Sequence, residues 1–279
     1  MTWTFTHDLA AYLAAAGPAV AGEPVANTSL LTVADALERR GLDAYGSDEP
    51  FFGWWTAADG SVAGAVLCTP PRPLLIGALP DEAVRGLGAA LAAEPLLAGV
   101  EALIGRRRDA EALAAAWGRP SEVTEENRLY RLAGLVAPDP VPAGRARTAT
   151  GADLPLLMDW AGAFKRETGE PGGPSEAFLR DRLSYGGMLL WEDAGTPVSM
   201  AGFFRPIGSA ARVGPVYTPP ELRGRGYAAG VTYAVSEAAY AAGASEVLLF
   251  TDLANPTSNG VYQRLGYTPV EDRIEVAAL

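Results

Sequence analysis

A short proline-rich segment near the middle of the chain sets the strongest limit on how the polypeptide can fold. Residues 137–144 read APDPVPAG, with three prolines and one glycine in eight residues. Proline has a fixed φ and lacks a backbone N–H, so this segment can join neither a helix interior nor a central strand. Such composition is typical of a linker. The sequence therefore predicts two domains, 1–136 and 145–279, joined by the linker 137–144.

The two segments beside this linker have nearly equal lengths and a similar order of helix-like and strand-like patterns. Hydrophobic spacing in the C-terminal segment predicts strand 145–150, helices 153–165 and 175–184, strands 187–192, 198–205 and 211–218, helix 226–242, strand 246–251, helix 256–265 and strand 272–276. The N-terminal segment predicts helices 9–16 and 32–40, a hairpin of 51–57 with 62–69, helix 81–93, strand 100–104, helix 109–117 and strand 127–132. These patterns predict a mixed α/β sheet flanked by helices in each half, and the shared order indicates an internal duplication.

Composition places the chain among globular proteins. Of its 279 residues, 49% are hydrophobic and 20% are charged, which is the balance of a folded domain and not of a disordered chain. No apolar run approaches the ~20 residues of a membrane-spanning helix. The N-terminus lacks the basic and then apolar pattern of a secretory signal, so we expect a cytoplasmic protein. Abundant alanine and arginine, with Lys165 as the single lysine, suggest a GC-rich bacterial origin.

Charge and the rare residue types narrow the classes of partner. The formal net charge of −11 argues against nucleic acid or an anionic membrane as the main partner, because this surface would repel both. A cationic or amine substrate fits better, although an acidic balance also serves solubility. One cysteine, Cys68, and one histidine, His7, cannot build an ordinary zinc site, so we expect no metal. We expect Cys68 to act as a small core hydrophobe and His7 to lie at the surface.

The stretch 216–228, VYTPPELRGRGYA, is the most specific chemical signal. A predicted strand ends in two prolines, and a turn rich in arginine and glycine opens directly into a long helix. The first N–H groups of a helix have no partner within it, and the positive end of the helix dipole lies there, so this turn is an anion site. Gly224 and Gly226 allow close backbone approach, and Arg223 and Arg225 can add positive charge.

This turn resembles the pyrophosphate-binding signature Q/RxxGxG/A of the GNAT superfamily of N-acetyltransferases, which Arg223, Gly226 and Ala228 match. A six-residue pattern is weak by itself in a chain rich in these residues. Downstream, residues 255–267, NPTSNGVYQRLGY, resemble the second cofactor segment of the family, NxxS/AxxxYxxxGF/Y, at the expected distance. The joint match identifies the C-terminal half as a GNAT-like domain.

The resemblance implies two tandem GNAT-like domains, of which the C-terminal one is catalytic and uses acetyl-CoA or another acyl-CoA. The pyrophosphate would be held at Arg223, Gly224, Arg225, Gly226, Tyr227 and Ala228. Main-chain groups near Val216 and Tyr217 would pair with the pantetheine arm like an added strand, and Asn255 and Ser258 would complete the cofactor site. Tyr262 would face the thioester sulfur and protonate the departing thiolate. A backbone N–H near the end of strand 213–218 would meet the oxyanion of the tetrahedral intermediate.

The general base is open at this stage. Strand 211–218 carries no carboxylate, so Glu170, Glu192 and Asp193 are the candidates, and each is also compatible with a solvated surface charge.

The N-terminal half lacks the side chains that the resemblance makes functional. Ala114 stands where Tyr262 stands in the other half, and Arg107 stands where Asn255 stands. Residues 85–90 formally match RxxGxA, but residues 80–82 have the pattern of a helix start, which places Arg85 inside a helix where backbone N–H groups are already paired. We interpret this half as a degenerate copy that stabilises the active half or forms a wall of its substrate cleft.

The predicted function is direct acyl transfer from acyl-CoA to a primary amine of a small molecule, such as an amino acid, a polyamine-like metabolite or an aminated antibiotic, by a monomer or homodimer. Two alternatives stay open: acetylation of protein lysines or N-termini, and a non-catalytic sensor of acyl-CoA. Tyr262 favours an enzyme over a sensor.

Overall fold

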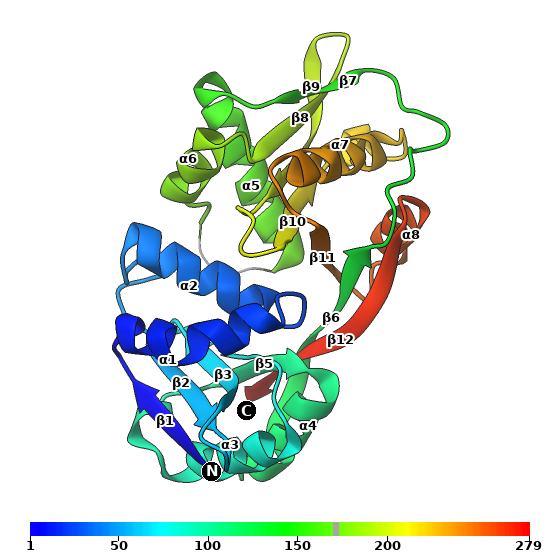
Figure 1. Cartoon of the computed structure of the whole chain (residues 1–279). Coiled ribbons are helices and arrows are strands. Elements are labelled where there is room, and N and C mark those ends of the chain that lie inside the picture. Colours follow the sequence, from blue (N-terminus) through cyan, green and yellow to red (C-terminus); the bar gives the residue numbers. More distant parts are fainter. Residues whose placement is uncertain (170–172) are drawn as a thin grey trace. The chain divides into compact units, whose positions relative to one another are not determined.

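Each half of the chain contributes the same elements in the same order (Figure 1). The first half contains β1 (Thr2–Thr6), α1 (Leu9–Gly22), α2 (Thr28–Arg40), β2 (Phe51–Thr56), β3 (Val62–Cys68), β4 (Leu74–Ile76), α3 (Asp81–Ala93), η1 (Pro95–Leu97), β5 (Ala102–Arg106), α4 (Arg107–Ala116) and β6 (Ser121–Leu132). The second contains β7 (Arg145–Thr148), η2 (Gly151–Asp153), α5 (Leu154–Thr168), α6 (Glu176–Ser184), β8 (Met188–Asp193), β9 (Thr196–Phe203), β10 (Ala210–Tyr217), η3 (Pro220–Leu222), α7 (Tyr227–Ala241), β11 (Glu246–Asp252), α8 (Pro256–Arg264) and β12 (Tyr267–Ala278). Apart from the short 3₁₀ turns, the two orders coincide, as an internal duplication predicts.

The computed structural model describes residues 1–169 and 173–279 and divides into two compact units. The N-terminal unit comprises Met1–Arg128 together with Glu271–Leu279, and the C-terminal unit comprises Leu129–Val270. Both units contain strands and helices in a mixed arrangement, so the predicted mixed α/β class is confirmed.

The N-terminal unit has the strand order β1-β2-β3-β4-β5-β12. Its neighbouring strands are antiparallel except for β4 and β5, which run parallel. Successive residues of β3 point to opposite faces of the sheet, as the period of a strand requires. Val66 and Cys68 join the core cluster beneath α3 and α4, and Ala65 and Leu67 join the cluster beneath α1 and α2. Helices therefore cover both faces of this sheet.

The C-terminal unit repeats this plan with the strand order β6-β11-β10-β9-β8-β7. Here β10 and β11 are the parallel pair. Leu189 and Trp191 of β8 belong to the cluster that α7 and α8 cover, and Met188 and Leu190 belong to the cluster that α5 and α6 cover. Figure 1 shows α7 packed across the strands of this unit.

The last strand of each half completes the sheet of the other half. Residues Arg273 to Ala277 of β12 pair antiparallel with Arg106 to Ala102 of β5, in the N-terminal unit. In the C-terminal unit, β6 takes the place beside β11. The division therefore falls inside β6 and β12, whereas the sequence placed the boundary at 137–144.

The proline-rich segment packs against the C-terminal unit. Pro142 is buried, and the carbonyl oxygen of Ala143 accepts a hydrogen bond from Trp191 Nε1 at 2.8 Å. Gly230 of α7 leaves no room for a Cβ, which would lie 2.8 Å from Pro142 and 3.0 Å from Trp191. The segment has the irregular backbone expected of a linker, but its side chains form part of the packing around α7.

Most predicted elements are confirmed to within a few residues, including the hairpin of β2 with β3 and the full length of α3. The sequence missed β1 and the three-residue strand β4, and it underestimated β6 and β12. Helix α1 continues through Pro18 to Gly22, whereas the predicted helix ended at residue 16. Cys68 is buried as expected, and burial raises the pKa of its thiol to about 12.

The strand exchange generates a prediction for Ile274, a fully buried residue of β12 that packs with Ala110 of α4. Replacing a buried isoleucine by alanine costs about 2–5 kcal/mol, so Ile274→Ala should destabilise the N-terminal unit. Hydrogen exchange followed by mass spectrometry should show faster exchange in β5. The control Val270→Ala removes an exposed side chain of the same strand and should change stability by less than about 0.5 kcal/mol. Faster exchange confined to the C-terminal unit would contradict the assignment of this strand.

Candidate active site

The parallel strands β10 and β11 of the C-terminal unit separate along their length. They pair from Ala210 and Glu246 to Val213 and Leu249, and the described pairing ends there although both strands continue. Pro215 lacks an N–H with which to continue the ladder, and Gly214 has a φ of 146° within an irregularity of the pairing with β9. The sequence GPVY thus opens a fork between two strand edges that carry backbone donors and acceptors.

Side chains from other elements hold the open arm of β10 in place. Arg182 of α6 donates a hydrogen bond to the carbonyl oxygen of Gly214. Ser199 of β9 donates from Oγ to the carbonyl oxygen of Tyr217 at 3.0 Å, and the same Oγ lies 2.8 Å from Thr218 Oγ1. These contacts therefore fix the last residues of β10, although β11 does not pair with them.

A turn led by glycine connects the fork to helix α7. Gly224 and Gly226 have φ values of 76° and 81°, in the region that glycine adopts without strain. Gly226 is the N-cap residue of α7 and provides no side-chain hydrogen bond, so the first N–H groups of a 15-residue helix lack an internal cap. The anion site at this turn stays a prediction, and these are the backbone features on which it depends.

The two arginines of this turn have different surroundings. Arg223 donates from Nε to the carbonyl oxygen of Thr218 at 2.9 Å and from a terminal nitrogen to Glu167 at 2.5 Å. Arg225 is exposed, lies 3.4 Å from the carbonyl oxygen of Glu221, and also contacts the hydroxyl of Tyr227. The charge of Arg223 is thus paired with a carboxylate, and Arg225 lies at the surface beside Tyr227.

The side chain of Tyr227 is used for packing. It is buried, and its hydroxyl donates to Asp193 at 2.5 Å, a bond that raises the pKa of Tyr227. Any contact of Tyr227 with a bound anion would therefore come from its backbone N–H.

Tyr262 of α8 lies in the core cluster that contains the branch point of the fork. That cluster also includes Val213 and Leu249, the last paired residues of β10 and β11, and Val216 packs against it. The ring of Tyr262 meets that of Tyr267 edge to face at 6.1 Å. Burial raises the pKa of Tyr262 to about 12, so its hydroxyl carries a proton at neutral pH.

Asn255 and Asn259 fix the start of helix α8. Asn255 is the N-cap residue, and its Oδ1 accepts from the backbone N–H of Ser258 at 3.0 Å. Asn259 donates to the carbonyl oxygens of Asp252 and Asn255, both at 2.8 Å, and accepts from Tyr130 at 2.9 Å. The amide oxygen of Asn255 is therefore occupied by capping, which leaves its amide nitrogen as the group that could reach a ligand.

Two of the three candidate bases are engaged in structural contacts. Glu192 accepts from Arg147 at 2.6 Å, and Asp193 accepts from Tyr227 at 2.5 Å. Both contacts favour structural roles for these carboxylates. Glu170 lies outside the described residues.

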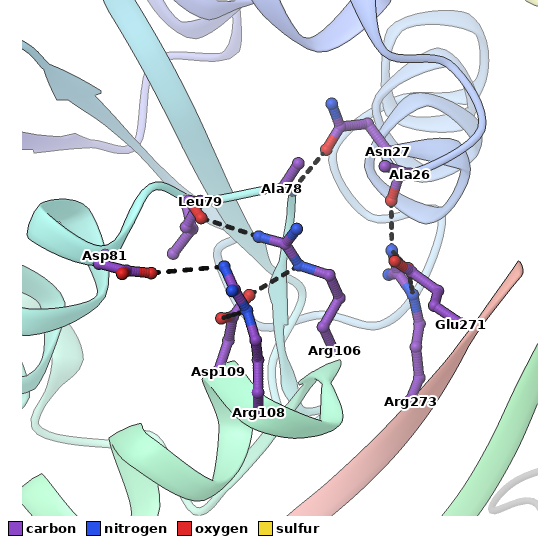
Figure 2. Close-up of polar contacts among 10 residues, drawn as sticks. All are labelled: Ala26, Asn27, Ala78, Leu79, Asp81, Arg106, Arg108, Asp109, Glu271 and Arg273. Atoms are coloured by element: carbon purple, nitrogen blue, oxygen red, sulfur yellow. Dashed lines mark hydrogen bonds and ion pairs between the residues drawn. The ribbon is translucent and has the colours of Figure 1, made fainter.

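The corresponding place in the N-terminal unit has different chemistry, as Figure 2 shows. Arg106, at the end of β5, donates to the carbonyl oxygen of Leu79 at 2.8 Å and to the buried Asp109 at 2.7 Å, and thereby ties β5 to the segment between β4 and α3. Helix α3 begins with Asp81 and Glu82, whose charges would repel an anion. Arg85 lies within this helix, as the sequence predicted, and Ala114 offers no hydroxyl.

A comparison with known protein families finds a match in the C-terminal half of the chain. Residues 154–267 match the model of the family described as Acetyltransferase (GNAT) family, a span that contains the fork, the glycine turn and Tyr262. This part of the chain is a GNAT acetyltransferase domain. Membership of this family implies acyl transfer from acyl-CoA.

Solved structures extend the GNAT fold to the whole chain. An acetyltransferase from the GNAT family of Colwellia psychrerythraea is similar over 100% of both chains, with a TM-score of 0.67 and 13% identity. A GCN5-related N-acetyltransferase from Sphaerobacter thermophilus is similar over 98% of this chain and 94% of that one, with a TM-score of 0.62 and 18% identity. At these identities the likeness is one of fold, and it agrees with two GNAT-like units in tandem. No curated protein matches the chain.

Two further properties concern residues 1–169 and 173–279. No helix there has both the length and the apolar character needed to cross a membrane. In the same residues, no three His, Cys, Asp or Glu side chains are grouped as ligands for a metal ion.

Sequence reasoning did not single out Glu167 or Asn259, whose side chains contact the turn before α7 and the start of α8. The predicted helix 153–165 ended before Glu167, whereas α5 extends to Thr168. Asn259 stands within the recognised motif at a variable position. The only available signal was that both are polar residues at the ends of elements that border the site.

Capping and ligand binding by Asn255 can be separated by substitution. Asn255→Ala should destabilise the start of α8 by about 0.5–2 kcal/mol, because it removes the acceptor for the Ser258 N–H. Asn255→Asp keeps that acceptor but loses the amide donor, so it should retain stability and bind CoA more weakly. Thermal unfolding and calorimetric titration with CoA would measure the two effects. Unchanged CoA affinity in Asn255→Asp would restrict this residue to capping.

Proposed function

We propose that the chain is an N-acyltransferase that moves an acyl group, most often acetyl, from acyl-CoA to a primary amine of a small molecule. The observation that carries this proposal is the convergence of three features in the C-terminal unit. The open arm of β10, the glycine-rich start of α7 and the buried side chain of Tyr262 all belong to one packed cluster and the turn beside it.

The residues present fit an acyl-CoA molecule. An extended pantetheine arm, with its alternating amide donors and acceptors, suits β10 at Val216 and Tyr217, which pair with β9 on one side and have no described pairing with β11 on the other, so that the arm would lie there like an added strand. The pyrophosphate suits the N–H groups from Arg225 to Ala228 at the positive end of α7. Space is available at Gly224, where an added Cβ would meet no atom within 4 Å.

The proposed chemistry is a direct transfer. The amine nitrogen attacks the thioester carbonyl carbon, and a backbone N–H near the end of β10 stabilises the oxyanion that forms. The carbon–sulfur bond then breaks, Tyr262 gives its proton to the departing thiolate, and the proton that the amine nitrogen loses passes through solvent and restores the hydroxyl of Tyr262. Burial raises the pKa of Tyr262, so the hydroxyl holds its proton at neutral pH until the thiolate forms. No covalent enzyme intermediate is needed.

An amine acceptor is consistent with the charge of the protein. With a net charge of −11, the molecule attracts cations. A protein lysine or N-terminus is the second candidate acceptor, because it presents the same primary amine. A screen of acyl-CoA donors by thermal stabilisation, followed by an amine library read out as free thiol, would separate these acceptors and identify the acyl chain. Stabilisation by acyl-CoA without turnover on any amine or peptide would favour a sensor.

The pyrophosphate assignment predicts that Gly226→Ala weakens CoA binding. A Cβ at this position of positive φ strains the backbone and lies 3.3 Å from Pro142, so the N–H groups of the turn can no longer converge. Losing one hydrogen bond to a charged group costs about 1.5–3 kcal/mol, or about 10- to 100-fold in Kd. Gly243→Ala is the matched control, because it imposes a similar positive φ beyond the far end of α7 with open space around it. Equal CoA affinities of the two variants in a calorimetric titration would remove this assignment.

The acid assignment predicts that Tyr262→Phe retains CoA binding and lowers turnover by about 10²-fold, the lower range for loss of a positioned acid. Tyr267→Phe removes a hydroxyl from the same cluster, where it bonds Ser236 at 2.7 Å, and should keep turnover close to that of the wild type. Arg85→Ala and Arg107→Ala in the N-terminal unit should also leave turnover unchanged. Steady-state rates of the four variants test the assignment. A normal rate for Tyr262→Phe would exclude it as the acid, and a loss confined to the arginine variants would place the active site in the other unit.

A further inference from the structure

Glu167 joins three parts of the GNAT domain through one carboxylate. It lies on the last turn of α5, and its Oε2 accepts from Arg223 of the turn before α7 at 2.5 Å. Its Oε1 accepts from the hydroxyl of Tyr217, at the end of the open arm of β10, at 3.1 Å. The helix, the strand arm and the turn are thus held by two hydrogen bonds to a single side chain.

Further contacts fix the two partners of Glu167, Tyr217 and Arg223. The ring of Tyr217 packs against that of Trp160 of α5, with the ring centres 6.2 Å apart. Desolvation, followed by the bond to Glu167, raises the pKa of Tyr217, so its hydroxyl stays protonated and continues to donate. Arg223 also donates to the carbonyl oxygen of Thr218, which fixes the direction of its guanidinium.

These contacts give the two arginines of the turn separate tasks. Arg223 has its charge paired with Glu167, whereas Arg225 is exposed beside the start of α7, where it contacts the hydroxyl of Tyr227. In the site proposed above, Arg225 is the cation placed to meet phosphate, and Arg223 is the one that shapes the turn. A motif alone cannot distinguish them, because both positions carry the same residue type.

We propose that Glu167 is a positioning residue for the acyl-CoA site, which acts through Arg223 and Tyr217 to set the turn and the β10 arm in the conformation that binds the cosubstrate. This proposal rests on the proposed function. Glu167 and Arg223 are 42% and 48% exposed, so their pair contributes little to global stability. Its effect is on geometry, since the N–H groups of the turn bind an anion well only when they converge.

The sign of the effect on affinity separates positioning from simple electrostatics. Removing a negative charge near a phosphate site would by itself strengthen the binding of a polyanion such as CoA. Loss of a positioning contact would weaken it. We expect Glu167→Ala to raise the Kd for CoA about five- to tenfold, within the range of coupling between residues in one network.

Two conservative variants sharpen the comparison. Glu167→Gln keeps the length and an oxygen acceptor, and Glu167→Asp keeps the charge but loses the reach. Positioning predicts that Glu167→Asp, which loses the reach, binds CoA more weakly than the wild type and that Glu167→Gln binds no more tightly than the wild type. A pure charge effect predicts that Asp binds like the wild type and that Gln binds more tightly. Glu176→Ala is the matched control, because it removes one carboxylate and one arginine pair, to Arg180 at 2.7 Å, from helix α6. It should leave the Kd for CoA unchanged.

The experiment is a calorimetric titration of the full chain with CoA for the wild type, the three Glu167 variants, Glu176→Ala, Arg223→Ala and the double variant Glu167→Ala/Arg223→Ala. Thermal unfolding of each confirms folding. We expect the double variant to bind no more weakly than Arg223→Ala alone, because the two residues act as one unit. If the wild type binds CoA and Glu167→Ala binds it equally well or more tightly, the positioning role is overturned and the proposed function stands. If the wild type binds no CoA, the proposed function itself fails.

Discussion

The separation of β10 from β11 is the constraint on which the C-terminal site depends. Two parallel strands that pair up to Val213 and Leu249 would ordinarily continue to pair. Their backbone N–H and C=O groups would then be used by each other, and none would be available to a ligand. Gly214 and Pro215 interrupt the ladder, and Arg182 and Ser199 keep the released arm extended. Because the arm cannot collapse onto its neighbour, its backbone groups stay available at the place where α7 begins. A strand edge that is already fixed lowers the conformational entropy cost of binding a ligand.

The two units have the same order of elements, but among their described residues only the C-terminal unit has the features of a ligand site. Both have a parallel strand pair whose two strands are connected by a helix, α3 between β4 and β5 and α7 between β10 and β11. In the C-terminal unit the link to the helix is rich in glycine and arginine, and in the N-terminal unit it ends in proline and two acidic residues. Arg106 there makes the contacts to Leu79 and Asp109 that hold strand and link together. The N-terminal sheet therefore obtains internal hydrogen bonds at the place where the C-terminal sheet leaves donors unused.

The sequence predicted the parts of this molecule that depend on local patterns. Periodicity located α3 and the hairpin of β2 with β3, since both are amphipathic segments with clear turn residues between them. The turn at Gly226 and the segment around Tyr262 could be found because a short stretch of chain carries their chemistry. The strand partners of β6 and β12 could not be found in this way, because a strand pattern shows which residues are extended but not which edge they join. Glu167 was missed for a similar reason, since its partner Arg223 is remote in sequence and a surface carboxylate has no distinctive pattern.

The exchange of last strands has a consequence for synthesis on the ribosome. Domains usually fold in order as the chain emerges, with the N-terminal one first. Here β5 emerges early, but its neighbour β12 is translated only after the whole C-terminal unit. The apolar edge of β5, with Leu103 and the positions that face Ile274 and Val276, therefore has to wait for its partner. An unpaired strand edge is a template for incorrect pairing, so the nascent N-terminal unit is the part of this protein for which a chaperone would be most useful.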